Sequence, residues 1–299
     1  MGICEKLAFG NKEQPMTLKQ KTIIAIPALT LCALAISCKK TDKTDALIDA
    51  AANNNAKKAV RLIEAGADVN ASGKIALIEA TKNNDAKEVA RLIEAGADVN
   101  AKDTGGEIAL IAAARNNAAD VTKLLIQADA NVNARGNEGT TALMIAAQRN
   151  AANAANVLIE AGATMNTTDY HNWTALMYAA RDRATDVVKL LIAAGADVNA
   201  TGDYGNTALM VAALENAATM ARLLIAAGAD VNTMNKFGET ALALAAKNSA
   251  ADAAELLIAH GADINARDDE GKTALMLAEE YNATDVIALL KDAGVHSGH

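Results

Sequence analysis

The sequence predicts an all-α repeat solenoid, and three observations support this prediction. The segment Gly-Ala-Asp-Val-Asn, or a close variant, ends in Asn at positions 70, 100, 133, 166, 199, 232 and 265. A second segment, Thr-Ala-Leu, begins at 141, 174, 207, 240 and 273, and Asp45, Ile75 and Ile108 hold the same place earlier. After a first step of 30 residues, every later step is 33 residues. A constant period of this length is typical of stacked units, because one such unit cannot bury its apolar face alone.

Each unit is predicted to contain two helices and a connecting loop. In the unit TALMYAARDRATDVVKLLIAAGADVN, Thr174 stands where an N-cap hydroxyl can accept a hydrogen bond from a backbone N–H. Apolar residues spaced i, i+3, i+4 follow it and predict a short first helix. A Val- and Leu-rich stretch predicts a second helix, which Gly195 ends because that position requires a left-handed backbone. Residues 200–206 leave room for a tight hairpin that contains Gly205.

These segments, Thr-Ala-Leu-Met, Ala-Ala, Leu-Leu-Ile and Gly-Ala-Asp-Val-Asn, together resemble the ankyrin repeat. The resemblance covers residues 45–294 in eight units, of which the first and last read as polar end caps. It implies helix-turn-helix units with a β-hairpin loop and a non-catalytic protein–protein interaction module. The usual His of the repeat is replaced by Met144, Met177, Met210 and Met276, so its hydrogen bonds between units are not expected. The Gly usual between the helices is mostly Asn, which tolerates the left-handed region.

Two local departures from the repeat are expected to affect the backbone. Asp129 stands where the other units have the helix-ending Gly, which predicts a strained left-handed Asp. Asn172 stands where the hairpin Gly is expected. The recurring Asn70 and its equivalents are interpreted as binding backbone groups of the hairpin.

Composition excludes several classes of function. A net charge of −8 and a pI near 5.1 argue against a nucleic-acid partner, because such binding needs clustered cations. Histidine is scarce, and no phosphate loop, nucleophile elbow or zinc-protease motif occurs. The recurring Asp residues come one per unit, too few in any one place for calcium. We therefore predict a non-enzyme with no cofactor and no metal.

The first 37 residues are predicted to be a signal peptide. Two lysines precede an apolar run from 23 to 36, which is too short to span a bilayer and ends just before Cys38. This pattern resembles a bacterial lipoprotein signal, which implies acylation of Cys38 and location in the cell envelope, in the periplasm or on the surface. Ala35 departs from the Leu preferred there, and Met16 is a possible true start. The alternatives are secretion without an anchor, or a hydrophobic N-terminal helix in a cytosolic protein. Residues 38–44 are predicted to form a polar tether and 295–299 a disordered tail.

Aromatic residues are concentrated in one part of the chain. Five of the seven lie between 170 and 237, and four of these fall in successive hairpin loops: Tyr170, Trp173, Tyr204 and Phe237. Exposed rings on adjacent loops are typical of an interface that binds another protein, so these four and the neighbouring His171 are candidate partner-binding residues. The alternative is that the rings pack the loops against each other. Tyr178 occupies a slot that is aliphatic in other units and is predicted to be core.

A row of side chains at the end of each first helix is the second candidate feature. Steps of 33 residues give Lys82, Arg115, Gln148, Arg181, Leu214 and Lys247. The ankyrin resemblance places this row in the concave groove. Four cations in an acidic chain predict that Arg115, Arg181 and Lys247 contact an acidic segment of a partner protein. The alternative is a local interaction of each cation with its helix C-terminus. A monomer is expected, and an architectural spacer or a regulatory subunit of an envelope enzyme remains the alternative function.

Overall fold

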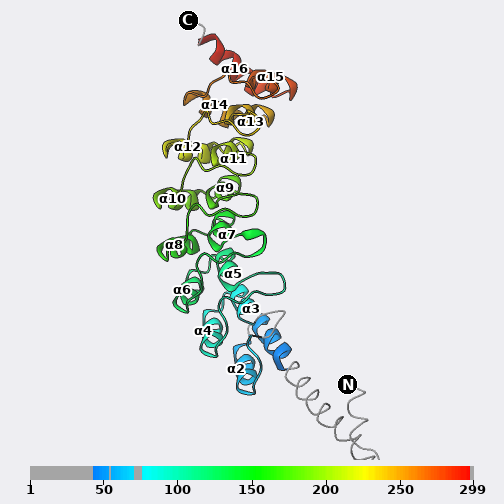
Figure 1. Ribbon diagram of the computed structural model, residues 1–299, viewed down its shortest axis with the longest axis vertical. Coiled ribbons are helices and arrows are strands. Elements are labelled where there is room, and N and C mark those ends of the chain that lie inside the picture. Colours follow the sequence, from blue (N-terminus) through cyan, green and yellow to red (C-terminus); the bar gives the residue numbers. More distant parts are fainter. Residues whose placement is uncertain (1–42, 54, 71–75, 297–299) are drawn as a thin grey trace, which may run out of the picture.

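The computed structural model describes residues 43–53, 55–70 and 76–296, and these form a single stack of helices in two columns (Figure 1). From the second unit on, the first helices have seven residues each: α3 (Ala76–Lys82), α5 (Ala109–Arg115), α7 (Ala142–Gln148), α9 (Ala175–Arg181), α11 (Ala208–Leu214), α13 (Ala241–Lys247) and α15 (Ala274–Glu280). The second helices are α2 (Ala56–Glu64), α4 (Ala86–Glu94), α6 (Ala119–Gln127), α8 (Ala152–Glu160), α10 (Thr185–Ala193), α12 (Ala218–Ala226), α14 (Ala251–Ala259) and α16 (Thr284–His296). The predicted all-α repeat solenoid is confirmed.

The helix signals act as the sequence predicts. The hydroxyl of Thr174 accepts a hydrogen bond from the Met177 N–H (3.3 Å), and the same cap begins α7, α11, α13 and α15. The sulfur of Met144 in turn accepts from the Thr141 N–H at 3.4 Å, so the Met that replaces the family's His still closes the cap. Gly195 follows α10 with φ +83°, the left-handed conformation that glycine adopts without steric cost.

The core is one continuous apolar cluster that runs from Leu47 to Leu290. The first helices are sandwiched between their neighbours, so that five of the seven residues of α9 are buried and six of the seven in α5, α11 and α13. Many of these residues are alanines, whose small side chains let successive helices pack closely. This continuous core is therefore built from contacts between neighbouring units, and stability depends on those contacts.

The Asn that ends each of the first six units binds the next unit rather than its own loop, which corrects the interpretation from sequence. The side-chain Nδ2 of Asn232 donates to the Gly261 carbonyl (3.2 Å), and its Oδ1 accepts from the Asp263 N–H (2.8 Å). Paired bonds of this kind also join the units at Asn70, Asn100, Asn133 and Asn199. We call this row the Asn ladder. It supplies hydrogen bonds between units.

The turn between the two helices is left-handed, as predicted, where Asn occupies it: Asn84, Asn117, Asn150, Asn216 and Asn282 have φ between +47° and +56°. Arg183 and Ser249 adopt the same conformation in the fifth and seventh units. Asp129 has φ +63° and Asn172 has φ +54°, so both predicted departures are present.

The ends of the domain and its loops differ from the prediction in detail. Residues 43–52 are helical, so the predicted 38–44 tether overlaps the first helix. Thr44 is buried there, and its hydroxyl accepts a hydrogen bond from the Asp68 N–H. At the other end, α16 continues to His296, although the repeat was predicted to end at 294. The predicted β-hairpins are tight turns in the described residues, with antiparallel pairing limited to isolated bridges at Lys102–Ile108 and Arg267–Thr273.

Candidate protein-interaction surface

The loops between units, here called fingers, project on the side of the first helices (Figure 1). In the finger before α9, the carboxylate of Asp169 accepts hydrogen bonds from the backbone N–H groups of His171 (2.9 Å) and Trp173 (2.8 Å). Asn235 and Asp268 hold the fingers before α13 and α15 in the same way. This Asx-turn arrangement fixes the tip of each finger and therefore the direction of the side chains that it carries.

The first pocket on this surface lies between two fingers and α9 and has a volume of about 280 Å³. We call it the aromatic pocket, and its lining consists of His171, Trp173, Tyr178, Arg181, Asp203 and Tyr204. The rings of Trp173 and Tyr178 lie 5.3 Å apart, tilted by 57°. The Arg181 guanidinium stands 5.4 Å from the first ring and 5.0 Å from the second, a cation–π arrangement that holds it against the pocket wall. Three predicted partner-binding residues and Arg181 thus meet in one hollow.

Tyr178 belongs to this pocket, which corrects its prediction as core. Its ring packs against the apolar cluster, but it is only partly buried and its hydroxyl donates to Asp169 Oδ2 at 2.6 Å. Burial and this bond to a carboxylate raise the pKa of the Tyr178 hydroxyl, so the group remains a hydrogen-bond donor. The sequence held one signal for this position: a Tyr stands where other units have an aliphatic residue, nine residues after an Asp that can accept its hydroxyl hydrogen.

The other predicted finger aromatics are exposed and lie along the same edge. Tyr204 is 61% exposed and Phe237 52% exposed, and their rings stack at 5.9 Å with an interplanar angle of 27°. The rings thus pack against each other and still face solvent. Both interpretations from sequence, exposed rings and rings that pack one loop against the next, therefore describe part of the arrangement. Tyr170 is 72% exposed, and a Cβ at Gly139 would come within 2.8 Å of its ring. Gly139 therefore makes room for Tyr170 beside the preceding finger.

A second pocket of about 390 Å³ lies further along, between two fingers, α13 and α15. We call it the acidic pocket, because five carboxylates and two lysines line it together with two rings and a leucine: Phe237, Glu239, Lys247, Asp268, Asp269, Glu270, Lys272, Leu277, Glu280 and Tyr281. Its net charge is −3. The Lys247 ammonium lies 5.9 Å from the Tyr281 ring. Sequence reasoning included Phe237 and Lys247 but missed the carboxylates, which come from two loops and a helix.

The predicted cationic row is present, but each of its cations has an acidic neighbour. Lys247 binds Glu239 (2.7 Å) and Arg181 binds Asp182 (2.8 Å), while Lys82 and Arg115 both pair with Glu107. Burial lowers the pKa of Lys82, but its bonds to Glu79 and Glu107 outweigh this and leave the pKa raised. Burial likewise raises the pKa of Glu107, yet its bonds from Arg115 and Lys82 outweigh this and lower it. The row is therefore a set of ion pairs rather than a strip of uncompensated positive charge.

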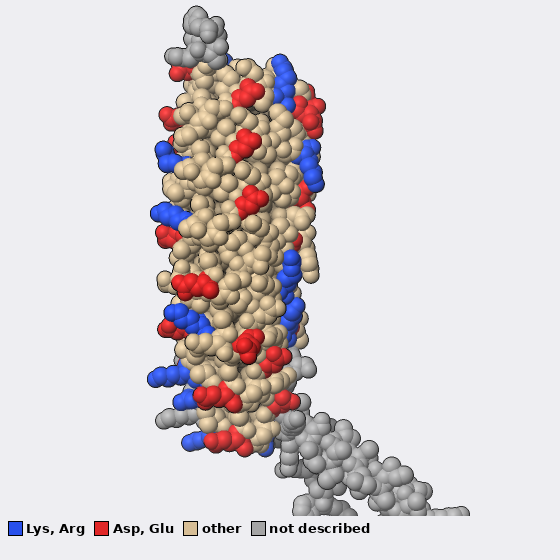
Figure 2. Space-filling model, turned by 60° about the vertical axis from the view of Figure 1, so that its left-hand side comes forward, with Lys and Arg blue, Asp and Glu red and all other residues tan. Residues whose placement is uncertain are grey.

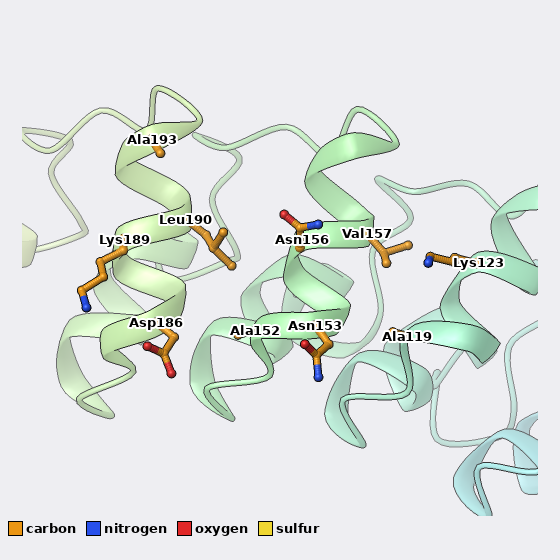
Figure 3. A pocket seen from close by; sticks show the side chains of 10 residues that line it. All are labelled: Ala119, Lys123, Ala152, Asn153, Asn156, Val157, Asp186, Lys189, Leu190 and Ala193. Atoms are coloured by element: carbon orange, nitrogen blue, oxygen red, sulfur yellow. The ribbon is translucent and has the colours of Figure 1, made fainter.

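The opposite side of the solenoid carries a wider hollow of about 700 Å³ across α6, α8 and α10 (Figure 3). Its floor is α8, where Asn153 and Asn156 replace the acidic and basic residues that α10 has at Asp186 and Lys189. The remaining lining consists of three alanines, Val157, Leu190 and Lys123. Figure 2 shows that the side carrying the second helices has a column of acidic side chains along its middle and charged side chains of both signs at its edges, with a largely uncharged surface between them. This hollow has no aromatic ring and no charge of one sign to select a ligand.

The remaining predicted residue, Cys38, lies outside the described residues. Within the part of the chain that the structure describes, no helix is both long and apolar enough to cross a membrane. The same part contains no group of three or more His, Cys, Asp or Glu side chains placed to hold a metal ion.

Comparison with protein families agrees with this architecture. A family model for ankyrin repeats (three copies) matches residues 23–103, 77–169, 164–235 and 209–298. Stacked helix pairs with fingers on one side, matched over most of the sequence, define a repeat scaffold for protein–protein interaction. The chain belongs to the ankyrin repeat family, which is generally non-catalytic. No curated protein matches the sequence significantly.

Proposed function

We propose that this protein binds a partner protein through the fingers and first helices of units five to eight. The observation that carries the proposal is the stacked pair Tyr204–Phe237, which stays half exposed between two pockets. Exposed rings supply rigid apolar contact area at small entropy cost and are enriched where truncation costs most binding energy. An architectural spacer, the alternative function, gives no reason for two large rings to face solvent on adjacent fingers.

The ion pairs of the groove cations bear on the charge expected of the partner segment. An acidic segment was predicted from sequence because four cations line the groove, and Arg115, Arg181 and Lys247 were its expected contacts. Each of these cations now has a carboxylate within 3 Å. An acidic partner would have to compete with these pairs, so we do not retain the acidic preference. We retain Arg181 as a partner contact because it lies over two rings of the aromatic pocket.

The test is to capture partners with the soluble 43–299 fragment and to repeat the capture with Tyr204→Ala/Phe237→Ala. Both rings are exposed, so the fold should be unchanged by circular dichroism, while binding of a partner that uses this surface should fall at least about tenfold. The matched control is Asn153→Ala/Asn156→Ala in the hollow of α8. A partner that loses affinity with the control and not with the ring variant would place the interface on the second helices and contradict this assignment.

We further propose that the domain is exported and anchored to a bacterial membrane through a lipid on Cys38. The basic residues, the apolar run 23–36 and the following Cys support this proposal. In a bacterial host, the wild type should partition into detergent and begin at Cys38, whereas Cys38→Ala should not be processed there. A native N-terminus at Met1 or Met16 would contradict the proposal.

A further inference from the structure

The aromatic and acidic pockets are the same site, built twice and separated by two units. Of the six residues that line the aromatic pocket, all except Tyr178 have a counterpart 66 residues later that lines the acidic pocket. The counterparts in the acidic pocket are Phe237 for His171, Glu239 for Trp173, Lys247 for Arg181, Asp269 for Asp203 and Glu270 for Tyr204. The two pockets therefore face the same way from equivalent places in the stack.

The equivalent place one unit after the aromatic pocket is occupied by an aromatic pair. There the two fingers carry Tyr204 and Phe237, whose rings stack against each other. The helix position held by Arg181 and Lys247 in the two pockets is Leu214 on α11. The surface thus alternates: a pocket, an apolar ridge of two rings, and a second pocket. A ligand that fills both pockets must cross this ridge.

The two pockets differ in chemistry. In the aromatic pocket, Arg181 and Asp203 are opposite in charge and the rings of Trp173, Tyr178 and Tyr204 dominate, so the pocket suits a flat apolar side chain. In the acidic pocket the net charge is −3, and the Phe237 and Tyr281 rings stand beside the carboxylates. Rings next to carboxylates favour a cationic side chain, and the observed Lys247–Tyr281 contact shows the geometry within the chain itself.

The spacing of the pockets sets the spacing of the ligand's side chains. Packed helices lie about 8–10 Å apart, so two units separate the pockets by roughly 16–20 Å. An extended chain advances about 3.3 Å per residue, and side chains on one face are an even number of residues apart, which gives roughly six residues. We propose that the partner presents an extended segment with an aromatic residue and, about six positions away, an Arg or Lys. This proposal rests on the proposed function and names the partner's chemistry.

A direct test uses synthetic 12-residue peptides with Trp and Arg six positions apart in a Gly/Ser background, in both chain directions. Fluorescence polarisation should show the better of these binding about tenfold more tightly than the same peptide with Glu for Arg, because like charges then meet in the acidic pocket. A peptide with Trp and Arg two positions apart should be similarly weakened. Equal binding of the Arg and Glu peptides, independence of spacing, or no binding of any peptide would overturn the proposal.

The matched protein variants separate this inference from the proposed function. Asp269→Asn/Glu270→Lys brings the acidic pocket from −3 to zero and should abolish the preference for Arg over Glu. Glu160→Lys/Asp186→Asn makes the same charge change on α8 and α10 and should leave the preference intact. If a captured partner is lost with Tyr204→Ala/Phe237→Ala but binds the Asp269→Asn/Glu270→Lys variant normally, the proposed function stands and the two-pocket inference falls.

Discussion

The side-chain Oδ1 of Asn199 accepts a hydrogen bond from the backbone N–H of Asp230, one unit further along the solenoid (2.9 Å). The Nδ2 of the same side chain donates to the Gly228 carbonyl at 3.1 Å. One residue thus satisfies two backbone groups in the turn of its neighbour. Because every such bond crosses from one unit to the next, the Asn ladder contributes to the coupling between units rather than to the stability of a single unit.

We expect Asn199→Ala to destabilise the domain by about 1–3 kcal/mol, since it leaves both backbone groups of the next turn without their partner. The free energy of unfolding from a urea titration measures this. Asn153→Ala, an exposed Asn on α8, is the control and should be close to neutral. Equal effects of the two changes would show that the ladder bonds are replaced by water at no cost.

Asp129→Gly should stabilise the protein by up to about 1 kcal/mol. The residue has φ +63°, and glycine adopts this conformation without the steric penalty of a Cβ. Its backbone carbonyl, which accepts from Asn100 Nδ2 at 3.2 Å, is retained in the variant. The denaturant midpoint should rise while the slope of the transition stays the same. A lower midpoint would mean that the Asp129 carboxylate contributes more than its backbone strain costs.

Glu88 predicts a pH dependence, because it is 1% exposed and its carboxylate oxygens accept no hydrogen bond. Burial raises its pKa; Arg91, at 3.8 Å, offsets this in part, and Asp85 adds to it. A carboxyl whose pKa is higher in the folded state destabilises the fold as pH rises above its unfolded value of about 4.3. Glu88→Gln should therefore be more stable than the wild type at pH 7, and this gain should shrink as the pH falls through the raised pKa of Glu88 and be lost below about 4, where the carboxyl is protonated in both states.

The control for this pH dependence is Glu94→Gln, at the exposed end of the same helix, which should change stability little at any pH. The two variants and the wild type are compared by urea titration at several pH values between 3 and 8. A gain for Glu88→Gln that stays constant over this range would show that the side chain acts through packing and not through its charge.

Lys247→Ala should destabilise the protein, because Glu239 is 8% exposed and would lose its ion-pair partner. The pair is partly solvated, so a loss of about 1 kcal/mol is expected. The bond to Glu239 raises the pKa of Lys247, so this stabilisation is complete below the unfolded pKa near 10.4 and is lost as pH rises through the folded value. Gln148→Ala, at the equivalent place in α7, is the control. Equal losses in both variants at pH 7 would show that Lys247 contributes only its packing.

Local signals in the sequence were sufficient for the fold. The hydroxyl of Thr174 and the left-handed Gly195 act within their own unit, so their residue types and spacing determine where α9 begins and α10 ends. The strain at Asp129 was predictable for the same reason. The tether was predicted to extend to residue 44, although residues 43 and 44 are helical, because the hydroxyl of Thr44 bonds to Asp68, 24 residues away, and nothing in the local composition indicates that contact.

The candidate site was predictable only in part. The exposed finger aromatics could be placed because the repeat register assigns each ring to a loop. The ion pairs of Glu107 could not be predicted in this way. This carboxylate stands on a finger, where it binds Arg115 from the end of α5 and Lys82 from the preceding unit. The sign of the charge in a groove depends on such pairs, and a count of cations in one row leaves out the carboxylates that neutralise them.

Because pocket, ridge and pocket follow one another unit by unit, the distance between the two pockets is set by a whole number of repeat units. Gaining or losing one unit between α11 and α13 would leave every other unit packed as before, because each contacts only its neighbours. It would nevertheless shift the two pockets by about 8–10 Å relative to each other. The length of ligand between the two pockets would therefore change in steps of about 8–10 Å by duplication of a 33-residue segment, without a single substitution in either pocket.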